Sequence, residues 1–168
     1  MAKRRDGNGP EKPATREVRL PVWSRPGFLI RRLHQIHYAL FFEECKESRL
    51  TPVQYGVVTA LTFRGELDQV SLAAELGLDR TTTAQVLSRL EARKLVARRS
   101  NPADRRAKLA RVTPRGRAVM SDAFEAMQRS QDRLCAPLSQ KERDVFMATL
   151  VRLIEANNEY GRGALRMD

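Results

Sequence analysis

Apolar residues recur at helical spacing over most of the chain beyond Pro26. In the segment that follows, two adjacent rows with steps of three and four residues are made up of Leu29, Ile30, Leu33, Ile36, His37, Leu40, Phe41 and Glu44. A surface helix needs a single apolar stripe, so this wide arc predicts a helix that is buried on two sides. We expect one of these sides to face a second copy of the chain.

Start and stop signals mark the helices that follow. Thr51 is a suitable N-cap with Pro52 at the first helical position, and Gly65 closes this helix. The same Thr-Pro signal at Thr113 and Pro114 predicts another helix. A final helix reaching about residue 160 is expected to turn inward the side chains of Val145, Phe146, Thr149, Leu150, Leu153 and Ile154.

The segment SLAAELGLDRTTTAQVLSRLEARK reads as two short helices joined by a tight turn. Ser71 is expected to cap a helix that ends at Leu76, and Gly77 supplies the turn. Asp79 is expected to cap a longer helix that reaches about Lys94. Two helices joined by a tight turn containing Gly have the layout of a helix-turn-helix.

Two extended stretches follow, residues 95–100 and 107–113. The turn formers Asn101, Pro102 and Asp104 lie between them. We therefore predict a two-stranded ribbon. The fold class is expected to be mainly α with a small two-stranded β element.

Positive charge gathers in the same region. The 168-residue chain has a formal net charge of +11. Residues 80–117 hold twelve Lys or Arg residues against two acidic ones, whereas the rest of the chain holds nineteen basic and eighteen acidic residues. A non-specific nucleic-acid-binding protein, the less favoured alternative, would spread its charge and expose aromatic residues for stacking. The concentration favours one phosphate-facing surface on a duplex reader.

The longer helix of the helix-turn-helix predicts how a base sequence is read. Its core-facing row is expected to be Leu78, Thr82, Val86, Leu87 and Leu90. On the opposite row, Arg can fork onto guanine and Gln onto adenine. The predicted DNA contacts of the two helices are Ser71, Arg80, Thr81, Thr82, Gln85, Ser88 and Arg89.

The ribbon adds three predicted DNA contacts, Arg105, Arg106 and Lys108. Arginines at its tip can reach the phosphate backbone or enter a narrow minor groove. Asp104 is expected to pair with one arginine and fix its direction. The alternative is an exposed ion pair without a functional role, worth ~0–1 kcal/mol.

The stretch LAAELGLDRTTTAQVLSRLEARKLVARRSNPADRRAKLARVTPRG resembles the winged helix-turn-helix of the MarR family of bacterial transcription regulators. The wing signature of that family is reproduced by Asp104, Arg105, Arg106, Lys108, Val112, Thr113 and Gly116. The resemblance implies a winged helix-turn-helix with a helical dimerisation region. It also implies a homodimer on a palindromic operator, usually a repressor that a small aromatic or phenolic ligand releases.

Four segments are expected, the first from its polar, proline-punctuated composition and the others from the helical pattern and the resemblance. Residues 1–25 form a flexible basic N-terminal arm and residues 26–50 a dimerisation helix. Residues 51–112 form the DNA-binding lobe, and residues 113–168 the C-terminal dimerisation helices.

The first helix carries candidate ligand-binding residues, because effectors in the family commonly lie between the dimerisation helices and the DNA-binding lobe. The candidates are Arg31, His34, His37 and Tyr38, which lie among aromatic and aliphatic residues. Cationic groups in apolar surroundings suit an anionic aromatic compound. Alternatively, His37 is a core histidine and Arg31 pairs with an acid across the dimer.

The two cysteines, Cys45 and Cys135, are assigned to packing. Neighbouring Glu43, Glu44 and Glu47 should raise the pKa of the Cys45 thiol and reduce its reactivity. A redox-sensing regulator of the same fold is the alternative.

Other classes of protein lack support in the sequence. It has no nucleophile–base pair at a known spacing, no Gly-rich phosphate loop and no metal-ligand cluster. We therefore predict a protein that is not an enzyme and uses neither cofactor nor metal. No apolar run approaches the ~18 residues of a membrane span, so we expect a cytoplasmic protein.

Overall fold

The computed structural model of the chain describes residues 22–104 and 107–166. The chain divides into two compact units, residues 1–33 and 34–168. In the first unit, η1 (Val22–Ser24) precedes α1 (Pro26–Glu44), which continues into the second unit. Within the described ranges, no helix has both the length and the hydropathy needed to cross a membrane.

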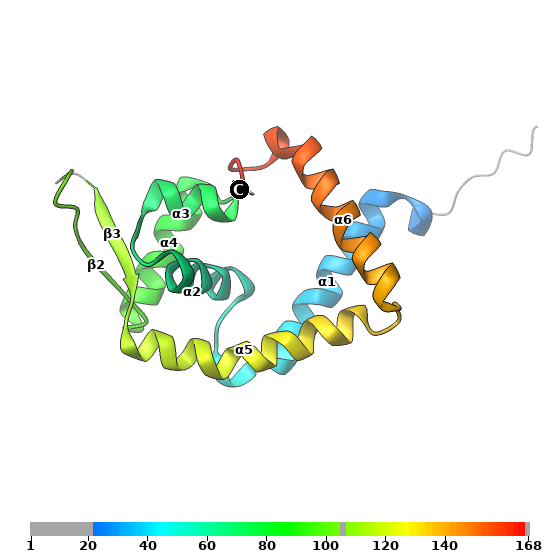
Figure 1. The fold of residues 1–168 in the computed structure, drawn as a ribbon, viewed down its shortest axis with the longest axis horizontal. Helices are drawn as coiled ribbons and strands as arrows, with labels where there is room; N and C mark the ends of the chain where they lie inside the picture. Colours follow the sequence, from blue (N-terminus) through cyan, green and yellow to red (C-terminus); the bar gives the residue numbers. More distant parts are fainter. Residues whose placement is uncertain (1–21, 105–106, 167–168) are drawn as a thin grey trace, which may run out of the picture. The chain divides into compact units, whose positions relative to one another are not determined.

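The next part of the chain is helical as predicted (Figure 1). Its helices are η2 (Lys46–Ser48), α2 (Pro52–Arg64), α3 (Gln69–Leu76) and α4 (Arg80–Ala92). The N-cap prediction for Thr51 is confirmed, since its hydroxyl accepts the Gln54 amide and the Gln54 side chain accepts the Thr51 amide, both at 3.2 Å. Gly65 ends α2, as expected.

The start of α3 differs from the prediction. Its N-cap is Asp68, whose carboxylate accepts the amides of Val70 and Ser71 at 2.8 and 2.9 Å. Ser71 lies in the first turn, and its hydroxyl donates to Asp68 at 3.1 Å. The prediction that Ser71 caps this helix is therefore wrong, because the carboxylate upstream already accepts two of the free amides.

The described residues contain one antiparallel sheet of three strands, ordered β1 (Leu67–Asp68), β3 (Lys108–Val112) and β2 (Val96–Ser100). The hairpin of β2 and β3 is confirmed. The structure adds a short third strand that the sequence did not predict: β1 pairs with β3 at the edge of the sheet, with Leu67 opposite Ala110. Ala110 and Val112 are buried on one face, which seats the hairpin on the helical core.

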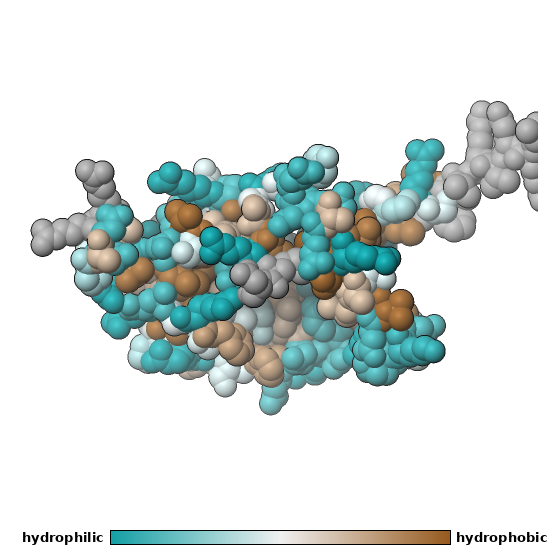
Figure 2. All heavy atoms as spheres, turned by 45° about the horizontal axis from the view of Figure 1, so that its top comes forward, coloured by the Kyte–Doolittle hydropathy of each residue, from teal (hydrophilic) through white to brown (hydrophobic). Residues whose placement is uncertain are grey.

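The C-terminal part consists of α5 (Pro114–Cys135), α6 (Gln140–Ala156) and η3 (Asn158–Tyr160). The Thr113 hydroxyl caps α5 by accepting the Gly116 amide at 3.0 Å. α6 has no buried residue, and Val145, Leu153 and Ile154 are 60%, 49% and 44% exposed. The prediction that these side chains point inward is wrong for the single chain. Figure 2 shows exposed apolar surface among polar surface.

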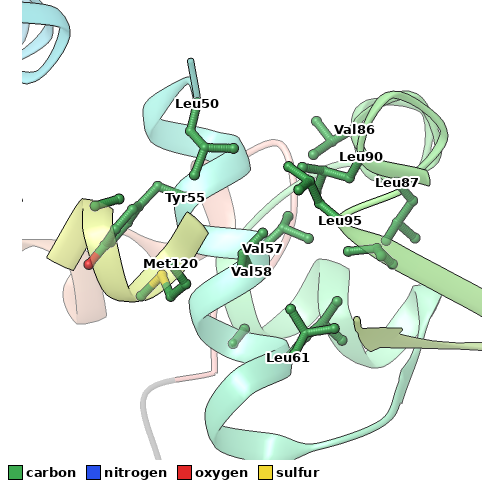
Figure 3. Close-up of a cluster of buried hydrophobic side chains, with 14 of the residues drawn as sticks. Leu50, Tyr55, Val57, Val58, Leu61, Val86, Leu87, Leu90, Leu95 and Met120 are labelled. Carbon is green, nitrogen blue, oxygen red and sulfur yellow. The ribbon is translucent and has the colours of Figure 1, made fainter. Parts of the chain in front are cut away.

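The core of the second unit forms around α2 (Figure 3). Val57, Val58 and Leu61 of α2 are almost fully buried. They belong to one cluster with residues of α4, the wing and α5, among them Leu87, Leu90, Leu95, Val96 and Met120. Burial of such aliphatic side chains stabilises a fold by roughly 1.5–3 kcal/mol each, so this cluster fixes the helix-turn-helix against α5.

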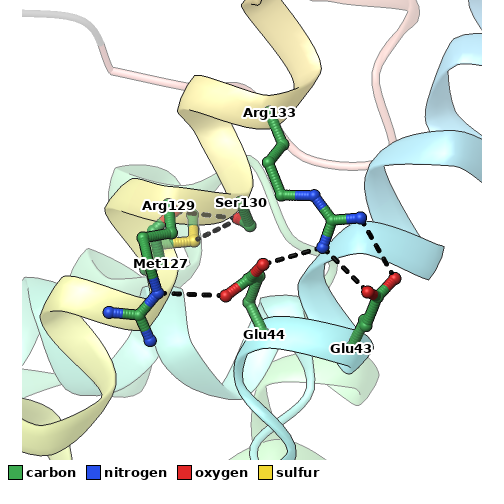
Figure 4. A network of polar contacts seen from close by, with 6 residues as sticks. All are labelled: Glu43, Glu44, Met127, Arg129, Ser130 and Arg133. Atoms are coloured by element: carbon green, nitrogen blue, oxygen red, sulfur yellow. Dashed lines mark hydrogen bonds and ion pairs between the residues drawn. The ribbon is translucent and has the colours of Figure 1, made fainter.

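Ion pairs join the end of α1 to α5 (Figure 4). Arg133 contacts Glu43 at 2.9 Å and Glu44 at 2.7 Å, and Arg129 contacts Glu44 at 3.0 Å. Hydrogen bonds from Arg133 and then Arg129 lower the pKa of Glu44. The last turn of α1 is thereby fixed to the C-terminal turns of α5.

Candidate nucleic-acid interface

Helix α4 presents a buried face and an open face, as an element that enters a DNA groove requires. Thr83, Val86, Leu87 and Leu90 are buried. The exposed residues other than the terminal Ala92 are all predicted DNA contacts, with Ala84 half-buried beside them: Arg80, Thr81, Gln85, Ser88 and Arg89. The open face therefore carries the side-chain chemistry that reads base edges.

The sequence predicted that Thr82 faces the core, but the neighbouring Thr83 is the buried residue. Thr83 is fully buried and donates to the Asp79 carbonyl at 2.9 Å, whereas Thr82 is half-buried. The Thr82 hydroxyl donates to the Asp79 carboxylate at 2.6 Å, and its amide does so at 2.7 Å. These bonds lower the pKa of Asp79, and the Thr82 hydroxyl is already engaged in the helix cap.

The hairpin of β2 and β3, called the wing below, is braced on both edges. Arg98 of β2 forms an ion pair with Glu91 of α4. Arg99 donates through Nε to Glu66 at 3.1 Å, next to β1. Arg111 of β3 lies 4.0 Å from the same carboxylate. Part of the wing charge is therefore used internally, and it fixes the wing relative to α4.

The loop of the wing is shaped by Asn101 and Asp104. The Asn101 side chain accepts the Ala103 amide at 3.0 Å, and the Asp104 carbonyl accepts the Ala107 amide at 2.9 Å. Arg105 and Arg106 lie outside the described residues, and so does the predicted pairing of Asp104 with one of them. Lys108 lies at the base of the loop and is exposed.

A hollow of about 400 Å³ separates the wing from the helix-turn-helix. Its lining residues are Asp68, Gln69, Val70, Arg80, Leu87, Arg98, Asp104, Ala107 and Lys108. Three cations, Arg80, Arg98 and Lys108, thus surround one concave surface. Such a surface suits a phosphate backbone that passes between a groove-reading helix and a wing.

The joint between α4 and the wing is tightly fixed. Lys94 adopts a left-handed conformation with φ of 58°. The Thr113 hydroxyl donates to the Lys94 carbonyl at 2.7 Å while it caps α5. Gly116 lies so close to Leu95 that an added Cβ would overlap the Leu95 carbonyl oxygen. Helix, wing and α5 therefore meet at one point without room for a larger residue.

Another cavity, of about 300 Å³, lies beside the turn between α3 and α4. It is lined by His34, His37, Tyr38, Pro52, Val53, Gly56, Leu76 and Leu78. The rings of His34 and Tyr38 lie 4.4 Å apart, and those of His37 and Tyr38 5.8 Å apart. Burial, and then the nearby His34, lower the pKa of His37. This cavity brings together three of the four predicted ligand-binding residues, His34, His37 and Tyr38. The fourth, Arg31, belongs to the other compact unit, where its guanidinium lies 5.1 Å from the centre of the Phe28 ring.

The cysteines lie in the interior. Cys45 is 3% exposed and Cys135 is 9% exposed. Burial and then the charge of Glu44 raise the pKa of the Cys45 thiol, which is the direction expected from the sequence.

Two residues of the interface were missed from the sequence. The Gln69 side chain donates to the Arg80 carbonyl at 2.9 Å and so joins the starts of α3 and α4. Arg98 lines the hollow while it pairs with Glu91. Arg98 belonged to the basic cluster, so charge density was a usable signal for it. Gln69 could have been identified only if the sequence had shown that α3 starts at this residue.

Known proteins resemble the chain over most of its length. A model described as the MarR family matches residues 50–107. The HTH-type transcriptional repressor NicR of Pseudomonas putida is 26% identical over 140 residues, which cover 83% of this chain and 89% of NicR.

Two solved structures show the same architecture. The PcaV transcriptional regulator of Streptomyces coelicolor, in complex with its natural ligand, is 36% identical with a TM-score of 0.77, over 82% of this chain and 96% of PcaV. Bordetella bronchiseptica BpsR, whose DNA binding is regulated by 6-hydroxynicotinic acid, is 32% identical with a TM-score of 0.76, over 79% of this chain and 95% of BpsR. With its winged helix-turn-helix and these relatives, the chain belongs to the MarR family, whose members are DNA-binding transcription regulators and not enzymes.

Proposed function

We propose that this protein is a homodimeric repressor that a small anionic aromatic ligand releases from a palindromic operator. The cavity lined by His34, His37 and Tyr38 is the observation that carries the proposal. Its volume of about 300 Å³ lies at the lower end of ligand sites, which favours a compound with one ring. All its other lining residues are apolar, so an imidazole that becomes protonated would be the partner of a carboxylate or phenolate.

The relatives support this ligand class. BpsR is regulated by 6-hydroxynicotinic acid, an aromatic carboxylic acid of one ring. NicR is a repressor. An effector of this kind would press on Leu76 and Leu78, which lead directly into α4. Its binding would therefore favour a different placement of the DNA-reading helix.

The DNA-binding part of the proposal assigns different roles to helix and wing. The exposed residues Thr81 and Gln85 of α4 would contact base edges, and Arg80 and Arg89 bases or phosphates. Lys108, with Arg105 and Arg106, would hold the phosphate backbone. Ser71 and Thr82 already donate hydroxyl hydrogens to cap carboxylates, so they would contribute to DNA contacts by accepting hydrogen bonds or through van der Waals contact.

Calorimetric titration tests the effector part. The probes are 6-hydroxynicotinic acid and a panel of substituted benzoic acids, added to the protein alone and to its complex with a duplex that the protein selects from a random library. We expect a binding compound to bind the complex more weakly, by the same factor by which it weakens DNA binding. A hundredfold factor corresponds to ~2.7 kcal/mol.

His37→Ala and His34→Ala, which both alter residues that line the cavity, should both weaken binding of that compound. Ala39→Ser, at an exposed position on the same helix, is the matched control and should leave it unchanged. Unchanged affinity in both test variants would place the ligand elsewhere, and unchanged affinity in the presence of DNA would exclude an inducer.

The redox-sensing alternative receives no support from the thiols. Burial and a raised pKa both reduce the reactivity of Cys45. A loss of DNA binding on treatment with peroxide that Cys45→Ala abolishes would favour it over the ligand-responsive repressor.

A further inference from the structure

The chain beyond α6 closes a loop of its own. Asn158 donates through its side-chain amide to the Leu165 carbonyl at 2.7 Å, and its side-chain oxygen accepts the Leu165 amide at 2.9 Å. The loop between them contains Gly161 and Gly163. We call residues 158–166 the C-terminal clasp.

The C-terminal clasp lies against the helix-turn-helix (Figure 1, where the red segment after α6 comes back to α3). The Arg166 amide donates to the Ala74 carbonyl of α3 at 2.9 Å. An added Cβ on Gly163 would overlap the Leu78 carbonyl oxygen, so the two backbones are in direct contact.

The turn meets the clasp with a glycine of its own. Gly77 has φ of +61°, and a Cβ built on it would lie 3.3 Å from the Leu165 Cβ. Close backbone approach on both sides is a specific fit, because any side chain at Gly163 would separate the two segments.

The turn that the clasp contacts, residues 77–79, leads directly into α4. Leu78 precedes Asp79, the N-cap of α4. Arg162 of the clasp also contributes to the lowered pKa of Asp79. Leu78 lines the cavity with the histidines as well. The clasp therefore holds Leu78, which borders both the cavity and the start of the proposed DNA-reading helix.

We propose that the C-terminal clasp is a positioning element for sequence-specific DNA binding. It holds the turn between α3 and α4 and so sets the direction in which α4 presents Thr81 and Gln85. Base contacts require placement within about 0.5 Å and 10–20°, whereas phosphate contacts by long side chains tolerate more. The clasp thus contributes to binding of a selected sequence and little to binding of random DNA. This role of the clasp rests only on the DNA-binding activity of the family and not on the proposed ligand.

Two variants that leave the net charge unchanged test this proposal. Gly163→Ala places a methyl group against Leu78, and Asn158→Ala removes both hydrogen bonds to Leu165. Ala164→Ser, at an exposed position between the contacts, is the matched control. Affinities are measured for a duplex selected by the wild-type protein and for a shuffled duplex of the same composition.

Both test variants should weaken binding of the selected duplex about tenfold, which corresponds to one good base contact, and change binding of the shuffled duplex less than about twofold. The control should change neither. Hydrogen exchange should show a protected Arg166 amide in the wild type and faster exchange there and in residues 73–79 in both test variants. The proposal is overturned by an unprotected Arg166 amide in the wild type, by equal losses on the two duplexes, or by unchanged selective binding once exchange has shown the clasp to be released.

Discussion

At the scale of single residues, His37 and Gly56 determine what the cavity can hold. His37 is half-buried, and its burial lowers its pKa. Gly56 lies on the α2 side of the cavity, and a Cβ there would lie 3.5 Å from Leu76, an ordinary contact distance. His37 therefore determines the charge in the cavity, and Gly56 determines how much room a ligand has.

Ligand affinity should depend on pH through His37. Burial and the nearby His34 lower its pKa in the free protein, and a bound carboxylate would raise it, so binding takes up a proton. The affinity for the ligand should therefore rise as the pH falls from about 8 to about 6. It should level off below the pKa that His37 has in the free protein. Titrations in buffers of different ionisation enthalpy measure the proton uptake. His37→Gln should abolish this dependence, and an unaltered slope in that variant would rule out the assignment.

Gly56→Ala should separate stability from binding. A glycine inside a helix costs roughly 0.5–1 kcal/mol relative to alanine, and the new methyl group has room, so the thermal midpoint should rise. The same methyl group narrows the cavity, so bulkier benzoic acids should lose more affinity than unsubstituted ones. A higher midpoint with unchanged affinity for every compound would contradict the location of the ligand.

At the scale of elements, the sequence predicted helices better than contacts between distant segments. Thr51, Asp79 and Thr113 each start a helix as expected, because a cap is a local signal. Strand β1 escaped prediction because two residues have no periodicity and depend on pairing with β3. The clasp escaped because its signal is a glycine whose partner backbone lies some 85 residues away.

Of the candidate site, the open face of α4 was predictable from its 3.6-residue period, except that Thr83 and not Thr82 is the buried threonine. Of the cavity, only the residues on α1, His34, His37 and Tyr38, could be predicted from the sequence. Its walls from α2 and α3 depend on tertiary packing that no local pattern encodes.

Helix α4 and the wing should fail differently when altered. Gln85→Ala and Thr81→Ala should each cost ~1–3 kcal/mol on the selected duplex and little on random DNA. Lys108→Ala should weaken binding to all duplexes and reduce the log–log salt slope by about one. Filter binding at several salt concentrations measures both effects. Equal losses on the two kinds of DNA for the α4 variants would indicate a non-specific binder.

At the scale of the whole molecule, α6 leaves apolar surface that the single chain does not cover. Val145, Met147, Val151, Leu153 and Ile154 are all at least 36% exposed. Exposed patches of this kind mark interaction sites, and a second copy of the same helix region would cover them.

Leu153→Glu should therefore dissociate the proposed dimer. Ala148→Glu introduces the same charge at an exposed position on the polar side of α6 and is the matched control. Sedimentation velocity should show a dimer for the wild type and the control, and a monomer or unfolded chain for Leu153→Glu. A folded wild-type monomer at micromolar concentration would refute the dimer and the palindromic operator together.

The fixed joint between α4 and the wing has a consequence for the DNA that such a protein can use. Lys94, Thr113 and Gly116 leave no freedom between the helix that enters one groove and the ribbon beside it. In the proposed dimer, the helix and the wing of each copy would then move together, and only the separation between the two copies could change. If the operator is the proposed palindrome, it should therefore tolerate an added base pair between its halves far better than one inserted within a half, because each half has a fixed length.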